Sequence, residues 1–299
     1  MPENRSNECL KFLQETASDI DKTSLKYIFW LLLTVLAICP YVSFADRSRQ
    51  SGSRQPAPGI KYNTLPGRLK KTRQLILVLS PDLTSTHARL YFFEKSKQGV
   101  WHEQLTALPV MLGARGMAWA EDLSGQFNQE LPRKKEGDLK SPAGLFAINE
   151  AFAYDHVPTH IRQLQLKTTT LCIDDTASAH YNQLIDTIGI SKDWKSAEHM
   201  RQVTQYRYGL VIEQNTVSTD SNSGTTGSSM QPVQKGAGSC IFVHIVSAAG
   251  KTTAGCTAMR EQDLTSLLER LDQEKLPVIV QLPLAQYKKY QKLLKLPSI

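Results

Sequence analysis

Short apolar runs bounded by turn-forming residues are the feature of this 299-residue sequence that most restricts its fold. Residues 75–79 (LILVL) form an uninterrupted apolar run that ends at Ser80, Pro81 and Asp82. Such a run predicts a buried strand. Residues 89–94 predict a second strand, and the few turn residues between the two runs predict a hairpin.

The same pattern continues to the end of the sequence. Further strands are expected over 108–112, 145–148, 171–173, 208–213, 240–246 and 277–282. Leucines at 264, 267, 268 and 271 fall on one face of a helix, residues 285–294 suit a short basic helix, and residues 193–200 suit a helical turn or two. No internal repeat is visible. The sequence therefore predicts a mostly β domain with a few helices, of the α+β class.

The N-terminal part contains a segment without charge over residues 27–44, which follows Lys26. Ser43 to Ala45 offer small residues at the spacing that a signal peptidase requires. We therefore expect residues 1–45 to be a leader and signal peptide that exports the chain to the cell envelope, the periplasm. An uncleaved membrane anchor over residues 27–44 is the alternative, since about 20 apolar residues span a bilayer. A buried core helix is a third interpretation.

Residues 46–72 are rich in Ser, Gly, Pro and Arg, and they predict a basic flexible linker ahead of a folded domain over residues 73–299. Much of the net charge of +7 lies in this linker. For an exported chain the matching partners are anionic membrane or wall polymer rather than nucleic acid, although a linker without a partner fits equally well. Residues 215–238 are of low complexity and predict a mobile loop, either a lid over a cleft or a tolerated insertion.

Five cysteines divide between the leader and the folded part. Cys9 and Cys39 lie in the leader, which leaves Cys172, Cys240 and Cys256 in the exported domain. An odd number in an oxidising compartment implies a free thiol or an intermolecular bond. We predict a disulfide between Cys172 and Cys240 and a reduced Cys256.

A histidine and a cysteine stand close to each other near the end of the chain. His244 lies on an apolar strand, a turn follows, and Gly255 and Cys256 precede what we expect to be a helix. A cysteine becomes nucleophilic as a thiolate, which an adjacent base generates. Gly255 permits a backbone shape whose N–H groups can hold an oxyanion. The alternative for each residue alone is a buried core position.

This segment resembles a known family. The run GSCIFVHIVSAAGKTTAGCTAMREQDL resembles the catalytic segment of the L,D-transpeptidases of the YkuD type, with His244, Gly255 and Cys256 on its motif. Residues 135–138 (KEGD) and 141–146 (SPAGLF) resemble an upstream stretch of that family. Residues 172–175 (CIDD) and 206–209 (YRYG) resemble one exported branch, so that the likeness covers roughly residues 73–282.

The resemblance implies a β-sandwich catalytic domain and a peptidoglycan L,D-transpeptidase, a cysteine-dependent acyltransferase. Cys256 would attack an L,D-peptide bond of a stem peptide, with His244 as base and the Gly255–Cys256 backbone as oxyanion hole. An amine would then resolve the thioester. We assign substrate contacts to Arg207, Tyr208 and Thr253.

Two departures from the family pattern concern the choice of substrate. Thr253 and Ala254 stand where many members have Ser-His, and Ala258 stands where many have Arg, with Arg260 two residues further on. Two alternatives stay open: water could resolve the thioester, giving an L,D-carboxypeptidase or wall hydrolase, or the domain could be a non-catalytic wall-binding module.

Neither a cofactor nor a metal is expected. His156 and His160 are spaced four apart, but Pro158 between them opposes the helix that a metal pair would need. Two resting states of the proposed catalytic pair are conceivable, a neutral pair and a thiolate–imidazolium pair. A helix beginning just after Cys256 would favour the second, because its N-terminus stabilises an anion.

Overall fold

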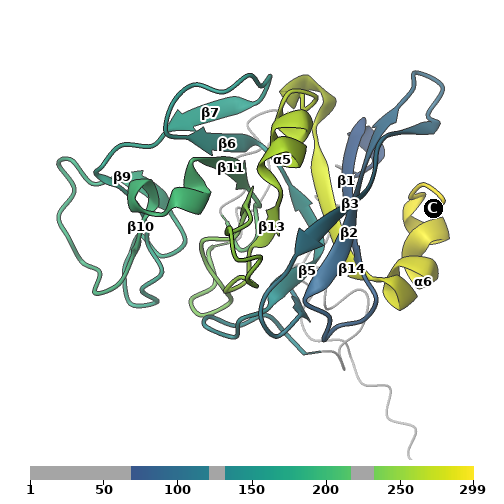
Figure 1. Cartoon of the computed structure of the whole chain (residues 1–299). Helices are drawn as coiled ribbons and strands as arrows, with labels where there is room; N and C mark the ends of the chain where they lie inside the picture. The colour runs from purple at the N-terminus through teal and green to yellow at the C-terminus, as the bar shows by residue number, and fades with distance from the viewer. Residues whose placement is uncertain (1–68, 121–131, 217–231) are drawn as a thin grey trace, which may run out of the picture. The chain divides into compact units, whose positions relative to one another are not determined.

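The computed structural model describes residues 69–120, 132–216 and 232–299. Strands make up 37% of the structure and helices 15%, which confirms the predicted class, mostly β with a few helices. Figure 1 shows the strands and helices with their labels. The strands are β1 (Gln74–Ser80), β2 (His87–Lys95), β3 (Trp101–Met111), β4 (Met117–Trp119), β5 (Ser141–Ala147), β6 (Glu150–Ala153), β7 (Arg162–Gln165), β8 (Thr170–Cys172), β9 (Leu184–Asp186), β10 (Glu198–His199), β11 (Tyr208–Val211), β12 (Phe242–Ile245), β13 (Thr257–Met259) and β14 (Val278–Pro283).

Most strands belong to one large sheet. Its order is β4-β5-β14-β1-β2-β3-β13-β12-β11-β6-β7, and a smaller sheet has the order β10-β8-β9. Strand β1 lies within the large sheet, and all of its residues are buried. It pairs antiparallel with β2, as the predicted hairpin requires, and parallel with β14 from the far end of the sequence. Because the side chains of β1 are buried on both faces of the sheet, residues 75–79 are apolar without alternation.

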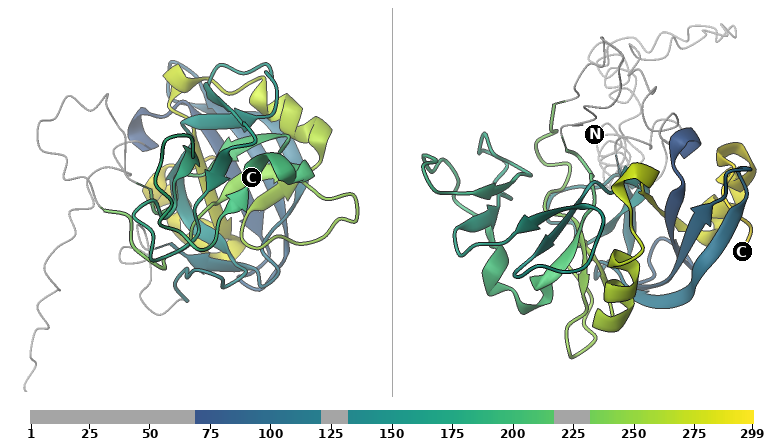
Figure 2. Two further views of the ribbon diagram at one scale, coloured as in Figure 1. Left: turned by 90° about the vertical axis from the view of Figure 1, so that its left-hand side faces the viewer. Right: turned by 90° about the horizontal axis from the view of Figure 1, so that it is seen from above.

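Two helices follow β13 and β14. Helix α5 (Glu261–Leu268) buries the predicted face, with Leu264, Leu267 and Leu268 almost fully covered. Helix α6 (Leu284–Leu294) buries Tyr287 and Tyr290 and packs against β14 and β1 close to the C-terminus (Figure 2). Both predicted helices are therefore confirmed, each within a few residues of its expected bounds.

A disulfide joins the two sheets. Cys172 ends β8 in the small sheet, and Cys240 lies just before β12 in the large one, with a Cα–Cα distance of 5.9 Å. Cys256 is free and buried. The predicted pairing is confirmed.

Two local predictions are wrong. Residues 193–200 form no α-helix: the chain bends, forms β10 and only then makes a 3₁₀ turn at Met200–Gln202. The reason is that Trp194 packs with Leu171 and Ile173 of the small sheet, a contact that an isolated helical turn would not provide. No helix starts at Cys256 either, because residues 257–259 pair as β13 between β12 and β3, and α5 begins at Glu261.

The expected linker and domain meet slightly earlier than predicted. Leu69 joins the core, and the Thr72 hydroxyl bonds to the carbonyl of Gln74, so residues 69–72 belong to the fold rather than to the linker. The expected leader and signal peptide (1–45), the linker up to residue 68 and residues 217–231 of the predicted loop lie outside the described residues. Within the described ranges, no helix has the length and apolar character needed to traverse a bilayer.

Candidate active site

His244 and Cys256 lie on neighbouring segments of the large sheet. Strands β12 and β13 run parallel, with His244 opposite Ala258. Cys256 precedes Ala258 by two residues, so it faces the same side of the sheet as His244. Both side chains are buried, and both line one cavity of about 410 Å³. The strand register therefore brings together two residues that are twelve positions apart in the sequence.

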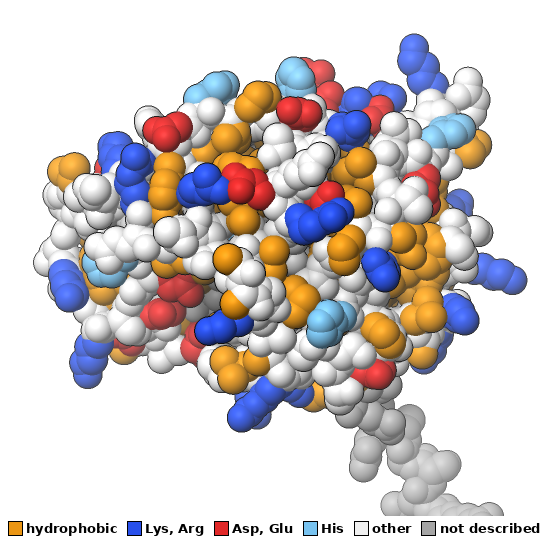
Figure 3. All heavy atoms as spheres, viewed as in Figure 1, with side chains coloured by type: hydrophobic (Ala, Val, Ile, Leu, Met, Phe, Trp, Pro, Cys, Tyr) orange, Lys and Arg blue, Asp and Glu red, His pale blue; other side chains and the backbone are white. Residues whose placement is uncertain are grey.

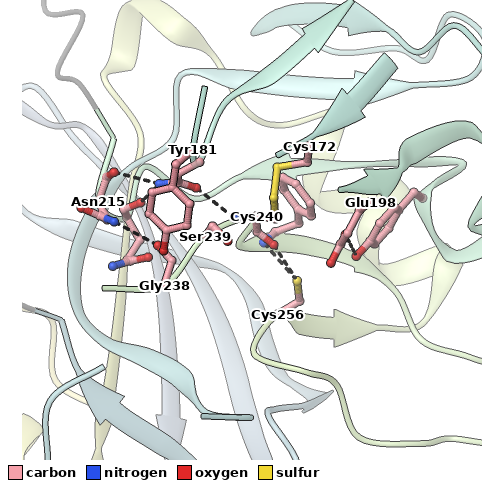
Figure 4. The surroundings of a disulfide bond; sticks show 12 residues. Cys172, Tyr181, Glu198, Asn215, Gly238, Ser239, Cys240 and Cys256 are labelled. Atoms are coloured by element: carbon pink, nitrogen blue, oxygen red, sulfur yellow. Dashed lines mark hydrogen bonds between the residues drawn. A yellow bond between two sulfur atoms is a disulfide. The ribbon is translucent and has the colours of Figure 1, made fainter. Parts of the chain in front are cut away.

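The sulfur of Cys256 is held by two backbone groups (Figure 4). The N–H of Phe242 donates to Sγ at 3.3 Å, and the thiol donates to the carbonyl of Cys240 at 3.5 Å. Burial, together with the nearby charge of Glu198, raises the pKa of the thiol to about 12. Cys256 is therefore a neutral thiol at physiological pH.

The imidazole of His244 is oriented by its own strand. Its Nδ1 lies 2.8 Å from the carbonyl oxygen of Ile245. A carbonyl only accepts, so Nδ1 carries the hydrogen and Nε2 is left as the acceptor of a proton. The Tyr206 ring packs edge-on against the imidazole, with centroids 5.2 Å apart. Burial lowers the pKa of His244.

The resting pair is therefore neutral rather than ionic. Burial opposes charge on both partners, and the helix N-terminus that would favour a thiolate is replaced by β13 after Cys256. His244 and Cys256 line the same cavity, and Nε2 of the imidazole is the nitrogen that can accept a proton there.

The backbone around Cys256 is fixed by hydroxyl groups. Thr253 Oγ1 donates to the carbonyl of Cys256 at 2.7 Å and accepts the N–H of Gly255 at 3.1 Å. Ser141 Oγ donates to the same carbonyl of Cys256 at 3.0 Å. Because the Gly255 N–H is engaged by Thr253, the N–H of Cys256 is the better candidate for an oxyanion donor.

The backbone approaches Gly255 closely. A Cβ at this position would lie 3.0 Å from the carbonyl oxygen of Lys140 and 3.3 Å from the side chain of Ile241. A side chain here would therefore force these neighbours to move by a few tenths of an ångström, directly beside Cys256.

The turn at residues 134–141 forms another wall of the cavity. Asp138 organises this turn by accepting the N–H groups of Lys135 and Lys140, both at 2.9 Å. It also pairs at 2.6 Å with Lys134, whose side chain is only 3% exposed. Glu136 and Gly137 line the cavity. The segment that resembles the upstream family stretch thus lies beside Cys256.

Two predicted substrate contacts lie elsewhere. Arg207 is half-exposed and pairs with Glu261 of α5, while the Tyr208 hydroxyl bonds to Glu261 and Thr265. Neither side chain lines the cavity, whereas Thr253 does. The difference arises because the chain turns through Thr204–Tyr206 before β11. As a result Tyr206 lines the cavity of Cys256, and Arg207 and Tyr208 do not.

Sequence reasoning did not single out two side chains that line the cavity together with Cys256, namely Glu198 and Tyr206. Tyr206 stands within the family-like run at 206–209, so a signal existed for it. Glu198 had none, because it lies on the two-residue strand β10 within the segment expected to be helical.

Comparison of the chain with protein-family models, with curated proteins and with solved structures gave no match. The assignment of a function therefore depends on the geometry of the site and on the family-like motifs in the sequence.

The surface adds little to that assignment. On the face shown in Figure 3, the basic and acidic side chains are interspersed rather than gathered by sign. Most of the basic stretch expected in the linker precedes residue 69 and lies outside the described residues, and its last members, Lys70 and Lys71, are exposed.

Proposed function

We propose that this chain is a cysteine acyltransferase of the YkuD type, a peptidoglycan L,D-transpeptidase with a β-sandwich catalytic domain. The observation that carries the proposal is the pairing of a buried thiol with a neutral, oriented imidazole in one cavity. Cys256 and His244 line that cavity, and the Ile245 carbonyl holds the imidazole with Nε2 free. A buried histidine in a core would also bond its ring N–H to a backbone carbonyl, so it is the shared cavity that supports the catalytic interpretation.

The convergence of separate sequence motifs supports the same function. The segment 135–138, the strand that begins at Ser141 and the loop ending at Cys256 are far apart in the sequence. They meet at the cavity through Glu136, through the Ser141–Cys256 bond and through Thr253. In the family these are the segments that surround the nucleophile.

The proposed reaction uses the groups that line the cavity. Sγ of Cys256 attacks the carbonyl carbon of an L,D-peptide bond while Nε2 of His244 takes the thiol proton. The carbonyl oxygen becomes an oxyanion that the Cys256 N–H stabilises. The leaving amine takes the proton from His244, and a thioester remains. A second amine attacks the thioester, its proton passes to His244, and the released thiol recovers it.

The proposed substrate comes from the resemblance to the family, and the proposed setting comes from the expected signal peptide. The donor would be a stem peptide of the wall, and the acceptor would be the amine of another stem. The chain would act in the cell envelope, where its exported domain would meet both. The basic linker would keep it close to anionic membrane or wall polymer.

The test is incubation of the purified chain with wall muropeptides, followed by mass spectrometry. Cross-linked dimers should form with the wild type and not with Cys256→Ala or His244→Ala. His199→Ala is a matched control, because His199 is exposed and lies outside the cavity. Shortened stems without dimers would indicate hydrolysis in place of transfer. If neither product appears with the wild type, the proposal fails.

A further inference from the structure

A tyrosine and a glutamate next to Cys256 have no part in the proposed reaction. The Tyr206 hydroxyl donates to Oε2 of Glu198 at 2.8 Å, and both side chains line the cavity of Cys256. Figure 4 shows the Glu198 carboxylate beside the sulfur and the disulfide. The Tyr206 ring is fixed by edge-on contacts with Phe242 and His244, at 5.4 and 5.2 Å. The hydroxyl is therefore held in place between the carboxylate and the thiol.

The Tyr206 hydroxyl has one proton and two candidate acceptors. Burial, the largest cause, and the negative charge of Glu198 raise the pKa of Cys256, whereas the hydrogen bond from Tyr206 to the sulfur lowers it. Tyr206 also donates to Glu198, and the thiol proton goes to the Cys240 carbonyl. The sulfur therefore shares the Tyr206 hydroxyl with a carboxylate whose charge it faces, and that charge disfavours a thiolate.

Other charged groups surround this pair. Asp174 and Glu136 face Glu198 and raise its pKa, although burial is the larger cause. Within the described residues, no hydrogen-bond donor reaches Oδ1 of Asp174. Lys134 faces Cys256, but its ammonium group is committed to Asp138. Of the described carboxylates that line the cavity, Glu198 is the one whose charge acts on the Cys256 thiol.

We propose that Glu198, tethered by the Tyr206 hydroxyl, holds Cys256 as a neutral thiol. Glu198 is a positioning residue, because it acts on the sulfur through its charge and through Tyr206. The inference builds on the proposed function, since it concerns the same nucleophile. Under this proposal the reactive thiolate of Cys256 exists only while His244 holds the thiol proton.

A suppressed thiolate has a clear use at this position. Thiolates, and not thiols, attack disulfides, and the Cys172–Cys240 bond lies within the same apolar cluster as Cys256. Thiolates are also the form that oxidants attack. A neutral resting thiol protects both the nucleophile and the disulfide in an oxidising compartment.

The experiment measures iodoacetamide alkylation of the Cys256 peptide by mass spectrometry between pH 5 and 10, with the full chain. Removal of a like charge that acts on a buried group shifts the pKa of that group by about 1 unit or more. Glu198→Gln should therefore label Cys256 roughly ten times faster than wild type at pH 8. Glu261→Gln, which removes a carboxylate outside the cavity, should match the wild type. Equal rates in Glu198→Gln and wild type would overturn the proposal.

A second measurement covers the case in which Glu198→Gln does not fold. In His244→Ala the labelling rate should fall tenfold for each pH unit by which the pH is lowered, as the thiolate fraction of Cys256 falls. In the pH range where Glu198 becomes protonated, the fall should be less than tenfold per unit, because the charge that repels the thiolate disappears there. A strict tenfold fall per unit over the whole range would contradict the proposal. Neither measurement uses a wall substrate, so absence of transpeptidation and absence of thiol control are separate results.

Discussion

Removal of the disulfide should cost the domain much of its stability. The Cys172–Cys240 bond closes a loop with a sequence separation of 68 residues. Closing a loop of this length removes enough entropy from the unfolded chain to stabilise the fold by roughly 4 kcal/mol. Typical domains have a free energy of unfolding of about 5–15 kcal/mol, so the double variant Cys172→Ser/Cys240→Ser should be marginal.

The loss should also reach the candidate active site. Cys240 has a positive φ of 54°, a conformation that few non-glycine residues adopt, and its N–H donates to Asn182 Oδ1 at 2.9 Å. Its carbonyl accepts the Cys256 thiol. Without the disulfide, only Asn182 among these contacts would hold Cys240 in this strained shape, so the thiol would lose a well-placed acceptor.

The assay is urea unfolding followed by tryptophan fluorescence without reductant. The double variant should unfold at a lower urea concentration, with the midpoint lowered in proportion to the lost free energy of unfolding. Its m-value should be larger, because its unfolded state is less compact. Cys256→Ala is the control, since Cys256 belongs to the same cluster but to no disulfide. A difference below about 1 kcal/mol between double variant and wild type would refute the loop-closure argument.

Three further predictions concern the core and the nucleophile. Alkylation of Cys256 should have a midpoint above the free-cysteine value of about 8.5, and fast labelling at pH 5 would instead reveal an ion pair. Because burial raises the pKa of Cys256 from 9.0 to about 12, the unfolded chain binds fewer protons than the folded one above pH 9. From pH 9 to 11 the wild type should therefore lose stability relative to Cys256→Ala by about 1 kcal/mol per pH unit, and parallel pH profiles in urea would contradict this. Gly209→Ala would place Cβ 2.5 Å from both the Val243 carbonyl and the Phe152 ring, so it should cost about 1–3 kcal/mol in thermal or urea unfolding, and a neutral effect would argue against the strand pairing.

The strand pattern was readable from the sequence because burial on both faces leaves a local trace. Residues 75–79 are apolar throughout, since β1 is covered on both sides and paired on both edges. The leucines of α5 recur at helical spacing for the same reason. Counting predicted one disulfide, because three cysteines outside the expected leader allow one pair and one thiol. The proposed role of Cys256 as the working thiol then left Cys172 and Cys240 as the pair.

The sequence by itself thus predicted the class of the fold and the disulfide, and it indicated His244 and Cys256 as a candidate pair. Only the tertiary structure decided their surroundings. Glu198 is positioned near the sulfur by the two-residue strand β10, and Arg207 pairs with Glu261 outside the cavity. Neither placement leaves a periodic signal in the sequence. The protonation state of the pair was likewise decided by burial of both groups. Burial and charge proximity depend on segments distant in sequence, and no local pattern records them.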